Sequence, residues 1–176
     1  MSSALNLPVT RFLYTLEITA KEGKHLSYSW NRLSNQAIDV DWVIGLEQTP
    51  GCAEQLEAFV SRFGRMQDTI ADKLLPRWLL ALAELPGSQI ETLNRAERLS
   101  ALSSTERWLE ARNLCNRLVH MTDPAKFAQD LVLAKEYSLM LIETFKRLRQ
   151  DAMARMGHKQ ENLPEAVLLP EKINNG

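Results

Sequence analysis

Hydrophobic side chains recur every three or four positions along most of this chain, and few glycines or prolines interrupt them. This spacing places the apolar residues on one face of an α-helix, whereas a half-buried strand would alternate apolar and polar residues. We find no alternating run that predicts a strand. The pattern therefore predicts an all-α fold, an antiparallel up-and-down bundle of four to five helices.

The first half of the chain contains two long amphipathic segments. A first helix is expected to begin near Pro8, because proline is favoured in the first turn of a helix. Residues 35–52 form a connecting segment with a short helical turn at residues 40–46. A second helix is expected from about Ala53 to the Pro86-Gly87 pair, with a kink at Pro76. The predicted buried face of the first helix consists of Phe12, Leu16, Thr19, Gly23, Leu26, Trp30 and Leu33.

The hydrophobic pattern in the second half of the chain predicts three more helices. A short one spans about residues 89–99, and the next runs from about Ser104 to His120. A long helix follows from Pro124 to Met156. Residues 1–156 should therefore form one helical domain, and residues 157–176 a flexible C-terminal tail, in which the string LPEAVLLP is a candidate for docking on a partner.

Composition narrows the class of protein. A chain of 176 residues that is 45% hydrophobic and 24% charged suits one soluble domain. The N-terminus lacks a signal-peptide pattern, and no apolar run approaches the ~18 residues of a spanning helix, so we expect a cytoplasmic protein without a membrane partner. A net charge of −1 excludes a globally basic surface, and any contact with nucleic acid must be local. The two cysteines have no partners at metal-ligand spacing, so we expect neither a metal nor a cofactor.

Candidate chemistry is concentrated in the string WLEARNLCNRLVH, from Trp108 to His120. On a helical wheel, Asn113 and Asn116 fall within about 40° of His120. Arg117 and Arg112 lie about 60° and 80° to either side of it, so the polar groups are predicted to converge. The opposite side should pack in the core, through Trp108, Ala111, Leu114, Cys115 and Leu118.

These residue types suit the handling of a phosphodiester. His120 is the candidate general base, because an imidazole can take up a proton near neutral pH. Arg117 or Arg112 is the candidate for stabilising charge on the phosphate, and Asn116 for orienting it. Two ordinary explanations stay open: a histidine near a helix C-terminus is favoured by the helix dipole, and the arginines can form surface ion pairs. The wheel separates Cys115 from His120 by about 140°, which argues against a catalytic thiol.

Asn116, three further residues and His120 resemble the helix-end pattern of the HEPN superfamily, in particular the HepT-like proteins and the small helical partners of minimal nucleotidyltransferases. Trp108 and the Arg62-Phe63 pair are also similar to these families, so the resemblance extends loosely over residues 53–156. Cys115 stands where the family pattern has arginine, and Thr122 stands where it often has tyrosine.

The resemblance implies a protein of a toxin–antitoxin or nucleotidyltransferase-associated system. Such a protein would be a homodimer, which we expect to form through the second helix and the helix that ends at His120. One alternative is a metal-independent endoribonuclease with His120 as its base. A second is a non-catalytic partner that binds a nucleotide or a nucleotidyltransferase, and a third is a purely structural helical dimer. An RNA or nucleotide ligand is expected in the first case and is one option in the second.

Overall fold

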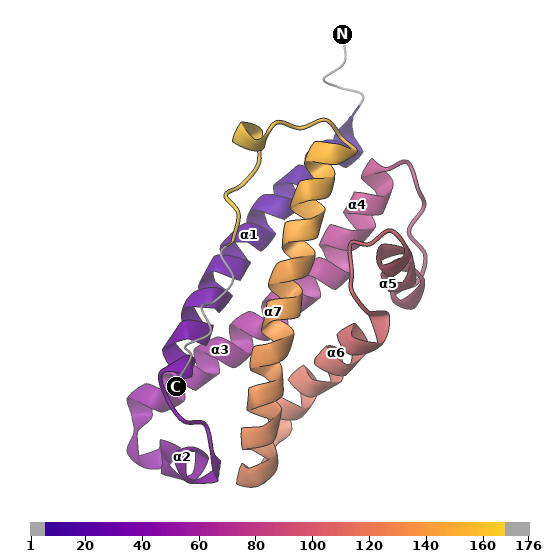
Figure 1. The fold of residues 1–176 in the computed structure, drawn as a ribbon. Coiled ribbons are helices and arrows are strands. Elements are labelled where there is room, and N and C mark those ends of the chain that lie inside the picture. Colours follow the sequence, from indigo (N-terminus) through magenta and orange to yellow (C-terminus); the bar gives the residue numbers. More distant parts are fainter. Residues whose placement is uncertain (1–5, 168–176) are drawn as a thin grey trace.

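Helix α1 (Leu7–Ser34) forms one long side of the molecule in the computed structural model, which describes residues 6–167 (Figure 1). Pro8 lies in its first turn, where the missing N–H costs no helical hydrogen bond. Every position predicted for the buried face of this helix is buried in the structure. The three- and four-residue spacing therefore identified the side of α1 that packs in the core.

The other elements are also helical. Within the described range no strand is present, so the predicted all-α class is confirmed. None of the helices in this range is both long and apolar enough to span a membrane. The remaining elements are α2 (Val40–Ile44), η1 (Gly45–Gln48), α3 (Pro50–Thr69), η2 (Ile70–Leu74), α4 (Leu75–Ala81), α5 (Gln89–Arg98), α6 (Thr105–His120), α7 (Pro124–Ala154) and η3 (Gln160–Asn162).

Long helices that alternate in direction enclose the core. In Figure 1, α1 descends, α3 and α4 return, α6 descends and α7 rises along the front. Helix α1 packs on α3, α4 and α7, whereas α6 packs on α3, α5 and α7. The largest side chains buried between them are Trp78, Trp108, Phe12, Phe59, Phe63 and Phe145.

The predicted irregularity at Pro76 takes the form of a π turn one turn earlier. Helices α3 and α4 join through η2, a five-residue π-helical segment, and Pro76 lies at the start of α4. The proline ring clashes with the carbonyl four residues before it in a regular α-helix, and the wider π turn relieves this crowding. The helix also begins earlier than predicted, at Pro50, and ends at Ala81 before the Pro86-Gly87 pair.

Helices α4 and α5 are each followed, two residues after their last residue, by a non-glycine residue in the left-handed conformation. Ala83, after α4, has φ 61°, and Ser100, after α5, has φ 63°. In both cases the next residue donates a backbone hydrogen bond to the carbonyl five positions before it, from Glu84 to Leu79 and from Ala101 to Ala96. This pairing satisfies carbonyls that the end of a helix otherwise leaves free. The predicted boundaries of α5 and of α7 agree with the structure to within two residues.

The first part of the predicted flexible tail packs on the helices instead. Leu163 and Val167 are buried, and Arg149 Nε donates to the carbonyl of Pro164 at 2.7 Å. Val167 lies against Gly23 of α1, where the absence of a side chain leaves room for it. Two apolar residues four apart are too few for a periodic signal, so the sequence pattern missed this contact. The rest of the predicted tail, residues 168–176, lies outside the described residues.

Candidate functional site

Helix α6 presents the predicted site residues at its C-terminal half. The helix begins after Ser104, whose Oγ accepts a hydrogen bond from the backbone N–H of Arg107 at 3.2 Å. It ends at His120, before the Asp123-capped start of α7. The site therefore lies at the corner between α6 and α7, where two helix ends meet.

One face of α6 is fixed by core packing, as predicted. Trp108, Ala111, Leu114 and Leu118 are buried. Cys115 is half-buried and packs beside them. Burial, with a smaller contribution from the charge of Asp68, raises the pKa of the Cys115 thiol. This thiol therefore stays protonated at neutral pH, and it does not act as an activated nucleophile.

The opposite face leaves Asn113, Asn116 and His120 exposed in one row. Within residues 6–167, the structure gives no hydrogen-bond partner to the side chain of any of these three. Val119, beside His120, is 65% exposed. We refer to Asn113, Asn116, Val119 and His120 as the α6 stripe. It offers two carboxamides, an imidazole and an apolar side chain to solvent.

Arg117 turns away from this stripe toward α7. Its Nε lies 3.1 Å from Asp130 Oδ2, and its terminal nitrogen lies 3.2 Å from Asp130 Oδ1. The Asp130 side chain is only 13% exposed. Hydrogen bonding to this carboxylate raises the pKa of Arg117, so the guanidinium stays charged. A planar guanidinium held by two parallel bonds has little freedom to reach another anion.

Arg112 turns in the other direction, toward α5 and η2. Its guanidinium donates to the side-chain oxygen of Gln89, and the amide nitrogen of Gln89 donates to Asp72 Oδ1 at 2.6 Å. Its charge also acts on Asp68, although burial and Asp72 together still raise the pKa of that carboxyl. The two predicted arginines therefore diverge from His120, and the expected convergence of the polar groups is absent from this single chain.

A groove of about 470 Å³ lies between α3 and α6, beside the stripe. Its apolar side is formed by Val60, Gly64, Cys115 and Val119. Its polar rim is formed by Ser61, Arg65, Asp68, Thr69, Asp72 and Lys73. The sequence pattern did not predict this rim, because which residues of α3 and η2 face α6 depends on how the helices pack. Two features of the sequence could have indicated this rim. They are Pro76 and the four-residue spacing of Asp68 and Asp72.

Within residues 6–167, no group of three or more His, Cys, Asp or Glu side chains is arranged to hold a metal ion.

Comparisons of the chain with protein-family models, with curated proteins and with solved structures found no match. The resemblance to the HEPN superfamily therefore rests on the sequence pattern of α6 and on the Arg62-Phe63 pair.

Proposed function

We propose that this chain is a HEPN-like helical module that binds a partner protein through the α6 stripe and does not cleave RNA. The observation that carries the proposal is the pair of bonds between Arg117 and Asp130. Cleavage of a phosphodiester requires a base together with a cation aimed at the phosphate. Here both candidate cations are engaged elsewhere, and Cys115 occupies the position where the family pattern has arginine.

The composition of the α6 stripe supports a protein partner. Carboxamides and an imidazole beside an exposed valine give a mixed polar and apolar surface, and interfaces between proteins commonly have this character. The neighbouring positive charges are largely balanced, since Arg117 pairs with Asp130 and Arg112 lies near Asp68. The resemblance points to a minimal nucleotidyltransferase as the partner. A homodimer remains compatible with this proposal.

The second candidate is the metal-independent ribonuclease. It is favoured by one observation, namely that Asn116 and His120 lie one helical turn apart on the same exposed face. In that case His120 would take the proton from a ribose 2′-hydroxyl, and a second copy of the chain would have to supply a free guanidinium.

A binding experiment tests the first candidate. The chain is coexpressed with each minimal nucleotidyltransferase of its genome, and complexes are measured by size-exclusion chromatography with light scattering. We expect a complex that Asn116→Ala and His120→Ala each weaken. Asn94→Ala is the matched control, because Asn94 is an exposed helical asparagine on α5. If no complex forms, or if the α6 variants bind as well as Asn94→Ala, the proposal is wrong.

A cleavage experiment separates the two candidates. The purified chain and His120→Ala are incubated with a mixed RNA pool in EDTA, and the products are examined for cyclic phosphate ends. We expect no cleavage by either protein. Cleavage by the wild type that His120→Ala abolishes would overturn the binding proposal in favour of the ribonuclease.

A further inference from the structure

Two tyrosines are exposed on the outer face of α1, on the side opposite the core. Tyr14 is 63% exposed and Tyr28 is 60% exposed. Positions seven residues apart on an α-helix differ by only ~20° in direction, so Tyr14, Lys21 and Tyr28 form one row. At ~1.5 Å per residue, the two rings lie about 21 Å apart along the helix. Exposed aromatic rings in a row offer flat faces on which other rings can stack.

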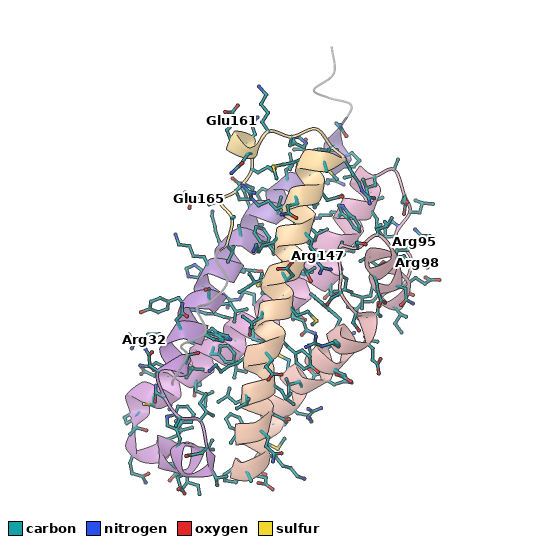
Figure 2. All side chains as sticks on the ribbon, in the orientation of Figure 1. Arg32, Arg95, Arg98, Arg147, Glu161 and Glu165 are labelled. Atoms are coloured by element: carbon teal, nitrogen blue, oxygen red, sulfur yellow. The ribbon has the colours of Figure 1, made fainter. Side chains whose placement is uncertain are left out.

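Positive charges accompany these rings. The guanidinium carbon of Arg32 lies 6.0 Å from the centre of the Tyr28 ring. Lys21 is exposed on the same side of α1, and the imidazole of His25 is exposed beside it as a polar group. Figure 2 shows Arg32 at the outer side of α1, far from Arg98 on α5. The aromatic row therefore has a cation between the two tyrosines, at Lys21, and another at Tyr28, from Arg32.

Helix α3 adds two guanidinium groups beside this row. A small pocket of about 180 Å³ is lined by Glu22, His25, Arg62 and Arg65. Arg62 is held in place by hydrogen bonds to Ser29 Oγ at 2.7 Å and to the carbonyl of His25 at 3.2 Å. Because guanidinium groups bind phosphate oxygens well, this pocket suits a phosphate group.

Glu22 is the carboxyl group in the pocket, and it is partly buried beside Thr69. One oxygen accepts a hydrogen bond from Thr69 at 3.0 Å, and the other is buried without a partner. Burial is the main cause that raises the pKa of Glu22. A nearby phosphate would stabilise the neutral form of this carboxyl further. Two guanidinium groups line the pocket together with this single carboxyl group, so the pocket can accept an anion despite containing a glutamate.

We propose that this face of α1 and α3 binds single-stranded nucleic acid, with a phosphate in the pocket of His25, Arg62 and Arg65 and with bases stacked on Tyr28 and Tyr14. Aromatic rings combined with cations that follow the backbone are the usual means by which proteins hold single strands. The charge is local, since the whole chain has a net charge of −1. Arg65 also lies on the rim of the groove beside the α6 stripe, whereas Tyr14 and Tyr28 lie on the outer face of α1, so the tyrosine variants test this proposal separately from the partner proposal.

Fluorescence anisotropy with a labelled oligouridylate of about 12 nucleotides tests the proposal, since stacking accepts any base. We expect binding at low salt. With two phosphates neutralised, Kd should rise about sevenfold when monovalent salt increases fourfold. Tyr28→Leu should raise Kd about tenfold, whereas Tyr28→Phe retains a stacking ring and should bind like the wild type. Arg65→Gln should raise Kd several-fold.

Arg98→Gln is the matched charge control, because Arg98 is an exposed arginine on α5. It should leave Kd unchanged. The substituted tyrosine and Arg65 are exposed, so thermal unfolding should confirm that the variants are folded. Absence of binding at low salt overturns the proposal, and this is the result expected if the face binds a protein instead. Equal effects of Arg65→Gln and Arg98→Gln, or no effect of Tyr28→Leu, also overturn it.

Discussion

Gly64 of α3 lies so close to Cys115 of α6 that a Cβ atom at Gly64 would stand 2.8 Å from the Cys115 Sγ atom. This separation is shorter than van der Waals contact. Helices α3 and α6 therefore reach their observed distance because residue 64 has no side chain. Both residues line the groove beside the α6 stripe, so this contact also sets how closely the walls of the groove approach each other.

A double-mutant cycle at this contact should show strong coupling. Gly64→Ala alone gains about 1 kcal/mol of helix propensity but loses about 1–3 kcal/mol to overpacking, so the free energy of unfolding should not increase. In a Cys115→Ala background the clash is gone, and the same substitution should stabilise the protein by about 1 kcal/mol. Denaturant unfolding of the four proteins measures the coupling energy. Equal effects of Gly64→Ala in both backgrounds would contradict the predicted clash.

Ser100→Gly should stabilise the protein. Ser100 has φ 63°, a conformation that costs a non-glycine residue about 1–2 kcal/mol. Glycine adopts this conformation without the steric penalty but loses more entropy on folding, so we expect a net gain of about 0.5–1 kcal/mol and a rise in Tm of about 2 °C. Ser61→Gly, at an exposed position inside α3, is the control and should lower the stability. A Tm for Ser100→Gly at or below that of the wild type would contradict the prediction.

The free energy of unfolding of Glu22→Gln should increase relative to that of the wild type as the pH rises above 4.5. Burial raises the folded-state pKa of Glu22 above its ordinary value of 4.5, against the opposing effects of Thr69, Arg65 and Lys73. Stability that depends on the neutral carboxyl is present below pH 4.5 and is lost as the pH rises through the folded-state pKa. Glutamine does not ionise, so the variant avoids this loss. Its advantage over the wild type, measured by denaturant unfolding, should therefore grow from pH 4.5 toward neutrality.

The control for this measurement is Glu17→Gln on the exposed side of the same helix. The two variants together separate the effect of the buried carboxyl from that of a changed net charge. A stability difference between Glu22→Gln and the wild type that does not vary with pH would show that Glu22 ionises freely in the folded protein.

Leu163→Ala should destabilise the whole domain. Leu163 belongs to the segment after α7 and is 9% exposed in the core. Removing most of a buried leucine side chain costs about 2 kcal/mol or more. Glu161→Ala, two residues earlier at an exposed site labelled in Figure 2, should change the stability by less than about 0.5 kcal/mol. Equal Tm values for the two variants would show that this segment adds nothing to the core.

The sequence predicted which faces of α1 and α6 are buried, because that information is local. The three- and four-residue spacing of apolar residues within α6 was enough to assign Trp108 and Leu118 to the core and Asn116 and His120 to the surface. The partners of the arginines were not predictable in the same way. Arg117 meets Asp130 on the next helix and Arg112 meets Gln89 on the previous one, and both contacts depend on how the helices pack.

Features that depend on backbone detail were also beyond the sequence pattern. Pro76 predicted an irregular helix, but its form as a π turn at Ile70–Leu74 follows from the competition between the proline ring and core packing on both sides. The contact of Val167 with Gly23 connects the last described residue with the first helix. A local sequence pattern cannot predict a contact between residues so far apart in the chain.

The π turn acts as a one-residue insertion that keeps two halves of a helix in phase. Phe59 lies before it and Trp78 after it, and both are fully buried. In an uninterrupted α-helix, the interval from Phe59 to Trp78 would span about 5.3 turns, which would swing Trp78 about 100° away from the direction of Phe59. One additional residue accommodated in the π turn reduces this to about five turns. Loss of any one residue of η2 would therefore still direct both aromatic rings into the same core, but the Pro76 ring would then meet the carbonyl four residues before it, which the π turn now avoids.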